Sequence, residues 1–445
     1  MKGPILRNPK YIILIMCLSI VILFGEVVIL DLASAEKTIS IAIADSPWLP
    51  GFRSLIDLYE QETGNRIKLN VFPFTGLLEK ELTAVNAKTS EFDIINLNEG
   101  WYSTFYAGGL VSPLTDIDPS FKLDPQVIEY QWATRWDKKK NYSVKDAPVY
   151  GVPINGNIQL FYYRTDLYKN GGFSAPTTWE DVIAAAQKLQ DPRKGIYGYV
   201  NRGQKGGISI SYDWFPFLRG FNGDIFADAP NDWTVTINSE AGKSALELYL
   251  NLAKFAPPNV GDIGQAEQIA LMGSGKVVQT ILVAAAFPHM DDPEKSIVPY
   301  KIGYTIIPRP SKGRHSTTSG IWLMGIPKNL PKARQSQALE FLKWAVSKKA
   351  QMAYAQFGAV PVRQDVFMSE LSNEPKFRYM KAMAASTSYI DPIIRIPEGP
   401  RIFEVLELRL NQALTKQLSI NEALATMERE ISGIVREAGY KLKNK

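Results

Sequence analysis

The chain has 445 residues, of which 45% are hydrophobic and 21% are charged, and its formal net charge is +5 at pH 7. This composition is typical of a globular protein of two or three domains and excludes general disorder. The charge is small and the basic residues are scattered, so a nucleic-acid partner is not expected. With two histidines and one cysteine, Cys17, the chain cannot assemble a zinc cluster, an iron–sulfur site or a Cys-His nucleophile, and we expect no metal and no cofactor.

The first 35 residues have the pattern of a secretory signal peptide. Lys2, Arg7 and Lys10 precede an uncharged apolar run over residues 11–25, and Ala33-Ser34-Ala35 has the small-x-small pattern of a cleavage site. An uncleaved anchor is the alternative, but the run is shorter than a helix that crosses the ~30 Å hydrocarbon core. We therefore expect cleavage after Ala35 and a periplasmic or extracellular protein.

The next 65 or so residues alternate between strand and helix patterns. Alternating hydrophobic residues predict strands at 39–43, 67–71 and 92–97. Helical spacing predicts helices at 52–63 and 77–88 between them, the first of which ends at Gly64. This β-α-β-α-β order favours a parallel, right-handed α/β unit.

The remainder repeats this order with more insertions. Strands are predicted at 158–163, 277–286 and 322–326, a glycine-rich loop at 202–211, and helices at 338–346 and along the tail from 401 to 441. Another helix begins near Trp179, with Thr177 and Glu180 spaced as a capping box. Because the α/β pattern restarts after residue 320, we expect the chain to pass between two lobes more than once and to leave a ligand cleft between them.

Aromatic and polar residues follow the predicted strands of the first unit, in the segments Asp45–Trp48, Phe72–Phe74 and Asn98–Trp101. Ligands of open parallel sheets bind beyond the carboxyl ends of the strands. None of these turns has the Gly-x-Gly-x-x-Gly pattern of a nucleotide site. Flat rings pack on the C–H faces of a sugar or polyol, while amides and carboxylates bond its hydroxyls. Tyr212-Asp213-Trp214, after the glycine-rich loop, and Trp322 are further candidates.

Any one of these aromatic residues could equally belong to the core, whereas Trp48, Glu99 and Trp101 together favour a cleft. The segment Gly273–Lys276 lacks the first glycine and the hydroxyl residue of a P-loop. A glycosidase needs two carboxylates placed across a bond, and Asp45, Glu99 and Asp213 leave that reading open.

Several segments, in order, resemble a known family. They are Phe92-Asp93-Ile94-Ile95 with Ala107–Leu114, Tyr150-Gly151-Val152-Pro153, Leu160–Leu167, Pro176–Asp181, Gly320–Pro327 and Gly358–Arg363. These segments are similar to those of the extracellular solute-binding proteins of ABC importers, the sugar-binding family that includes maltose-binding protein. The resemblance spans most of residues 38–365.

The resemblance implies an α/β, two-lobed periplasmic-binding-protein fold, in which each lobe is a mainly parallel sheet flanked by helices and three crossovers join the lobes. The crossovers would fall near 149–153, 319–321 and 363–366. Residues 36–150 and 321–365 would form lobe I, and residues 151–320 and 366–445 lobe II. The resemblance also implies no catalysis, a membrane-embedded ABC permease as partner, and a monomer.

The same resemblance places sugar contacts at Asn98, Glu99, Trp101 and Asn157, and Trp322 at the second crossover. A tryptophan common in the family after the strand near 277–283 is missing, and Phe287 is its candidate replacement. The full set of expected ligand-binding residues is Trp48, Asn98, Glu99, Trp101, Asn157, Asp213, Trp214, Phe287 and Trp322.

We therefore expect a secreted solute-binding protein that captures a neutral sugar, oligosaccharide or polyol between two lobes and delivers it to an ABC importer. A binding protein for a peptide, a polyamine or another small solute remains an alternative, and so does a secreted glycoside hydrolase with a carboxylate pair. A charged ligand would require a buried arginine or carboxylate clamp in the cleft.

Overall fold

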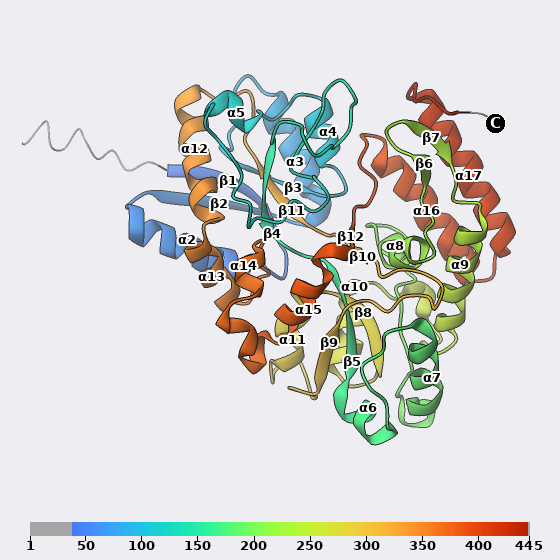
Figure 1. Cartoon of the computed structure of the whole chain (residues 1–445). Coiled ribbons are helices and arrows are strands. Elements are labelled where there is room, and N and C mark those ends of the chain that lie inside the picture. The colour runs from blue at the N-terminus through green and yellow to red at the C-terminus, as the bar shows by residue number, and fades with distance from the viewer. Residues whose placement is uncertain (1–37, 444–445) are drawn as a thin grey trace, which may run out of the picture.

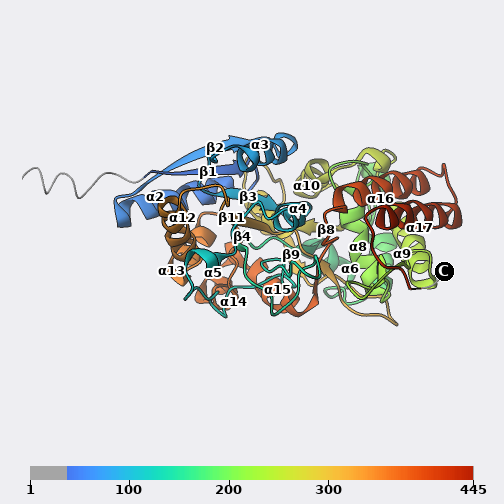
Figure 2. The same ribbon diagram turned by 90° about the horizontal axis from the view of Figure 1, so that it is seen from above.

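The structure, a computed structural model, describes residues 38–443, so the expected signal peptide and its cleavage site lie outside the described residues. Two lobes, each a sheet covered by helices, lie beside each other (Figure 1). Figure 2 shows the same two lobes from above, with the C-terminal helices on the side of the second lobe. This confirms the two-lobed fold expected from the sequence.

The first lobe is built on five strands. β1 pairs with β2 in parallel, a parallel bridge between Ile41 and Ile94 joins β1 to the segment that leads into β3, and β11 lies between β3 and β4. The elements around this sheet are β1 (Thr38–Ala44), α2 (Leu49–Thr63), β2 (Arg66–Phe72), α3 (Phe74–Asn86), β3 (Ile95–Asn98), α4 (Tyr102–Ala107), α5 (Leu114–Ile117), β4 (Gly151–Asn155), β11 (Trp322–Gly325), α12 (Lys332–Ala345), α13 (Lys348–Gln356) and α14 (Gln364–Phe367).

The second lobe is built on β5, which lies between β8 and β9, and parallel bridges join the segment at 197–200 to the β8 edge. Its elements are β5 (Gln159–Arg164), α6 (Thr165–Gly171), α7 (Trp179–Leu189), α8 (Ile210–Gly220), β6 (Phe226–Asp228), β7 (Asp232–Val235), α9 (Glu240–Ala253), α10 (Gln265–Gly273), β8 (Gln279–Val283), α11 (Phe287–Asp291), β9 (Ile302–Thr305), β10 (Thr317–Thr318), α15 (Tyr379–Ser386), β12 (Ile390–Asp391), α16 (Gly399–Leu414) and α17 (Ile420–Glu437).

Each sheet is mainly parallel, as expected, and contains one reversed strand. β11 is antiparallel to both β3 and β4, and β5 is antiparallel to both β8 and β9. Both reversed strands are the first that the chain forms after it arrives from the other lobe. Such a strand enters its sheet at the cleft and runs away from it, whereas β1, β3, β4 and β8 run toward the cleft and end there.

Local sequence signals explain several helix boundaries. The expected face of α2 is buried through Phe52, Leu55, Ile56 and Tyr59, and the helix ends at Gly64, whose positive φ of 72° suits glycine. The C-terminal tail is helical as expected, but as two packed helices, because a capping box at Ser419 and Glu422 starts α17.

The capping box expected at Thr177 and Glu180 lies one residue further along the chain. Thr178 is the N-cap of α7 and accepts from the Asp181 N–H, while the Asp181 carboxylate accepts from the Thr178 N–H at 2.9 Å. The same carboxylate also accepts from the Thr177 N–H at 3.0 Å. Asp181, at position N3, is therefore the acidic residue of the capping box, a role that the sequence pattern assigned to Glu180.

Candidate functional site

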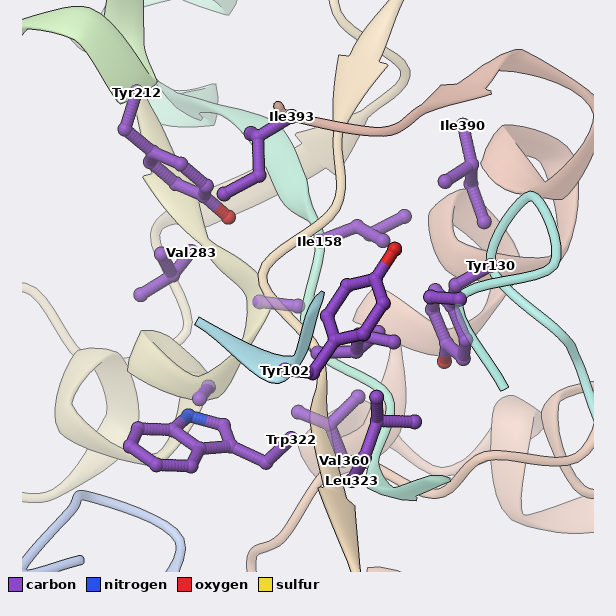
Figure 3. Close-up of a cluster of buried hydrophobic side chains, with 14 of the residues drawn as sticks. Tyr102, Tyr130, Ile158, Tyr212, Val283, Trp322, Leu323, Val360, Ile390 and Ile393 are labelled. Atoms are coloured by element: carbon purple, nitrogen blue, oxygen red, sulfur yellow. The ribbon is translucent and has the colours of Figure 1, made fainter. Parts of the chain in front are cut away.

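A cavity of about 340 Å³ lies between the two lobes, near the lower end of the range of roughly 300–1,000 Å³ usual for small-molecule sites. The ends of β1, β3, β4 and β8 and the start of β11 meet there. Figure 3 shows part of its apolar lining, with Trp322 on one side and Tyr212 and Ile393 on the other. The lining residues are Asp45, Ser46, Pro47, Trp48, Phe74, Asn98, Glu99, Asn157, Arg202, Gln204, Gly206, Gly207, Ile208, Ser209, Tyr212, Gln265, Val283, Ala285, Ser319, Gly320, Trp322 and Ile393.

The first lobe supplies an aromatic wall. Trp322, at the start of β11, has its ring centroid 6.0 Å from those of Trp48, Phe74 and Trp101, and Phe74 lies 5.2 Å from Trp101. These residues follow or begin strands that end at the same edge of the sheet, which is why they meet. Their edge-to-face and tilted packing holds each ring rigidly, so the wall is organised before a ligand arrives.

Glu99 is the most strongly perturbed acidic residue of this wall. It is 1% exposed, and its Oε1 accepts hydrogen bonds from the Ser319 hydroxyl and, at 3.2 Å, from the Ile393 N–H. Its Oε2 is buried and has no hydrogen-bond partner among residues 38–443. Burial raises the pKa of Glu99 to about 7, against the opposing effects of the Ser319 bond and of the Arg395 charge. Near neutral pH this carboxyl group therefore exists in both its neutral and its ionised form.

The second lobe faces the aromatic wall with Arg202 and Tyr212. The Arg202 guanidinium lies 5.2 Å from the Tyr212 ring centroid and donates to Gln268 at 3.2 Å and to Gln265 at 3.1 Å. Its Nε lies 3.3 Å from an Asp213 carboxylate oxygen, and both side chains are almost completely buried. The charge of this arginine is thus compensated within the protein and is not free for an ionic ligand.

Polar groups at the connections between the lobes complete the site. Asn157 follows β4, and its Oδ1 accepts from the Ala285 N–H at 3.0 Å, while the Gly320 N–H donates to the Asn157 carbonyl at 2.9 Å. Asn98 is held by its own turn, where its Oδ1 accepts from the Gly100 N–H at 2.9 Å. These bonds fix the amides and leave their remaining donors and acceptors available to a ligand.

Five of the residues expected to bind ligand line this cavity: Trp48, Asn98, Glu99, Asn157 and Trp322. Trp101 packs behind Trp322 and lines an adjacent cavity.

The structure places the other three expected residues elsewhere. Asp213 accepts from Gln159 at 2.7 Å and pairs with Arg202 behind the wall, and Trp214 is completely buried in the core. Phe287 stacks on Tyr379 with ring centroids 3.9 Å apart, and it does not line the cavity. For Asp213 and Phe287 the reason is a close partner from a distant part of the chain, which a single sequence does not show.

Other lining residues were not singled out from the sequence. Arg202, Gln204 and Ile208 come from the glycine-rich loop and Gln265 from the start of α10. The run of glycines was the signal that could have drawn attention to this loop, because such loops allow close backbone approach.

The described part of the chain holds no group of three or more histidine, cysteine, aspartate or glutamate side chains placed to bind a metal ion. Among residues 38–443, no helix combines the length and the hydrophobicity needed to cross a bilayer.

Comparison with known proteins agrees with the two-lobed fold. A mannitol-binding protein of Pseudomonas aeruginosa is 22% identical over 430 residues, which cover 92% of this chain and 95% of that protein. A solute-binding protein of Agrobacterium radiobacter K84, solved in complex with ribitol, is 24% identical with a TM-score of 0.76 over 89% of this chain and 98% of its own. Maltose-bound MalE3 of T. maritima is 21% identical with a TM-score of 0.77 over 89% of this chain and all of its own.

The family model for bacterial extracellular solute-binding proteins matches residues 46–352, which is more than half of the chain. The matched region includes the aromatic wall, Glu99, the glycine-rich loop and both reversed strands. The chain therefore belongs to the bacterial extracellular solute-binding protein family.

Proposed function

We propose that this protein binds a neutral sugar or polyol in the interlobe cavity and delivers it to the membrane-embedded permease of an ABC importer. The observation that carries the proposal is the pairing of an aromatic wall with polar groups of little net charge. Trp48 and Trp322 offer ring faces to C–H groups, and Asn98 and Asn157 offer amides to hydroxyls. The relatives named for mannitol, ribitol and maltose support this ligand class.

A charged ligand fits the cavity less well. The buried cation of the cavity lining, Arg202, already pairs with Asp213 at 3.3 Å. Burial holds the pKa of Glu99 at about 7. An anionic ligand would therefore meet no unpaired buried cation, and a polyamine would meet a carboxyl group that is only partly ionised near neutral pH. The family, whose members bind solutes, supports a role without catalysis.

The division into lobes is part of the proposal. β4 pairs with β11, so we place the first crossover at 156–158, a few residues later than the sequence suggested. The second lies at 319–321, between β10 and β11, and the third between α14 and α15. A monomeric state, a cleaved signal peptide and a periplasmic or extracellular location complete the proposal.

Isothermal titration calorimetry tests the ligand class. We expect saturable binding of at least one member of a panel of sugars and polyols. In urea unfolding, the same ligand at 100 times its Kd should raise the free energy of unfolding by about 2.7 kcal/mol. Trp322→Ala should weaken binding roughly tenfold or more, because it removes a ring from the cavity wall.

Trp344→Ala is the matched control, since this indole lies away from the cavity and donates to Glu62 at 3.0 Å. Its affinity for the ligand should equal that of the wild type. Absence of any response across the panel at millimolar concentration would refute the proposed ligand class.

A further inference from the structure

Residues 205–209 of the glycine-rich loop have an unusual backbone. Gly206 and Gly207 have positive φ angles of 91° and 68°, and Ile208 follows with a φ of 55°. Glycine adopts such angles readily, but a β-branched residue there is a genuine outlier. Strained residues of this kind persist where surrounding contacts hold them and where the resulting side-chain position matters.

Contacts from α16 hold this loop in place. The carboxylate of Glu407 accepts from the Ser209 N–H at 3.0 Å and from the Ser211 N–H at 2.9 Å. Glu407 is only 3% exposed, so these bonds are shielded from water. The loop is thus anchored at its end, directly beside Ile208.

The anchored loop brings Ile208 onto the opposite lobe, at Gly100. A Cβ atom added to Gly100 would lie 2.6 Å from the Ile208 Cδ1, so the isoleucine occupies the space that any larger residue would need. Gly100 directly follows Glu99 in the turn after β3. The contact therefore joins the two lobes immediately beside the candidate site.

This contact lies between two cavities. The ligand cavity and a second cavity of about 350 Å³ share Gly206, Gly207 and Ile208 in their linings. The second cavity is walled by Trp101 from the first lobe and by Phe403 and Leu408 from α16. A ligand that extended from the first cavity toward α16 would have to pass the Ile208–Gly100 contact.

We propose that Ile208 is a specificity-determining residue whose contact with Gly100 limits the ligand to a single sugar unit, either a neutral monosaccharide or its open-chain alditol. This inference rests on the proposed function and narrows its ligand class. The rings of Trp48 and Trp322 and the amide of Asn157 serve one unit, and Ile208 closes the route by which a second unit would enter the neighbouring cavity.

Calorimetric titration of the full-length mature chain with ribitol, mannitol and maltotriose tests the inference. The wild type should bind ribitol or mannitol at least about tenfold more tightly than maltotriose, which corresponds to about 1.4 kcal/mol. Ile208→Gly should remove this preference by strengthening maltotriose binding roughly tenfold. The variant should fold, because glycine adopts the backbone angle of this position without strain.

Two further variants serve as controls. Ile208→Leu keeps a side chain long enough to reach Gly100 and should keep the wild-type preference. Ile297→Gly makes the same isoleucine-to-glycine change at a side chain that is 75% exposed, and should also leave the preference unchanged. Thermal unfolding checks that all variants are folded.

The outcomes separate the two proposals. If the wild type binds maltotriose as tightly as the single-unit ligands, or if Ile208→Gly keeps the wild-type preference, the role of Ile208 is overturned while the sugar or polyol function stands. If no carbohydrate binds to the wild type, the proposed function is overturned and this inference with it.

Discussion

Glu99 shows how a single buried residue can connect a ligand site to the connections between lobes. Its Oε1 is bonded to Ser319 in the second crossover and to Ile393 in the segment that leads to α16, while its Oε2 has no partner within the described region. Arg395 is the cation that acts on it, and the negative charge of Glu99 contributes to the raised pKa values of Tyr102, Tyr130 and Tyr212. An unpaired buried oxygen of this kind is costly unless a water or a ligand satisfies it.

The raised pKa of Glu99 makes a prediction about stability. Its pKa is about 7 in the folded protein against 4.5 for a glutamate in water, so the folded state binds the proton more tightly. The resulting stabilisation is complete below pH 4.5 and is lost as the pH rises through 7, by up to about 3 kcal/mol. Glu99→Gln, which is neutral at every pH, should lack this contribution.

Urea unfolding of the wild type and of Glu99→Gln between pH 4 and 8 measures the contribution of Glu99 to the free energy of unfolding. The difference between wild type and Glu99→Gln isolates Glu99, because burial also raises the pKa of Glu81, Asp213 and Glu407 and these groups are common to both proteins. A difference that stays constant over this range would contradict the assignment.

Residue types and strand ends were sufficient to predict that Trp48, Glu99 and Trp322 lie at the cleft. A residue that directly follows or begins a strand at the cleft is held at that edge of the sheet by the strand itself. These two signals were not sufficient for α8. Tyr212 lines the cavity, whereas its neighbours Asp213 and Trp214 turn inward. The partners that decide this, such as Arg202 for Asp213, are known only from the folded chain.

Helix starts show the same limit at the scale of an element. The sequence correctly predicted that a helix begins near Trp179, but it assigned the cap to Thr177. In the structure Thr178 is the N-cap of α7. The spacing of threonine and an acidic residue fits both registers, because Glu180 and Asp181 are adjacent. Only the hydrogen bonds of Asp181 decide between them.

Replacing each threonine in turn tests this register. Thr178→Ala removes the acceptor for the Asp181 N–H and should lower the free energy of unfolding by about 1 kcal/mol. Thr177→Ala removes only a side-chain contact to Asp181 at 3.2 Å and should cost less than about 0.5 kcal/mol. Urea denaturation of both variants makes the comparison, and an equal loss in the two would place the cap elsewhere.

The direction of β5 and β11 could not be predicted from the sequence. Hydrophobic patterning predicts that a segment is a strand, but a strand reads alike in either direction. Direction is determined by where the chain enters the sheet, and both strands enter from the opposite lobe. The two lobes and their repeated crossings, by contrast, followed from the order of the elements alone.

At the scale of the whole molecule, the cavity draws its lining from both lobes, so a ligand that binds there stabilises the arrangement with the lobes together. We expect the radius of gyration, measured by small-angle X-ray scattering, to fall when a binding sugar or polyol saturates the protein. Trp322→Ala at the same ligand concentration should show a smaller change, and an unchanged radius in the saturated wild type would argue against closure.

The position of β11 has a consequence for biogenesis. This strand lies between β3 and β4 in their sheet, and its Trp322 pairs with Asn98, more than two hundred residues earlier in the chain. Contacts across such long loops form slowly because the intervening chain must first lose conformational freedom. The amino-terminal half of the polypeptide therefore lacks an inner strand of its own sheet until residue 325 has been synthesised, so the sheet of the first lobe is completed late in synthesis.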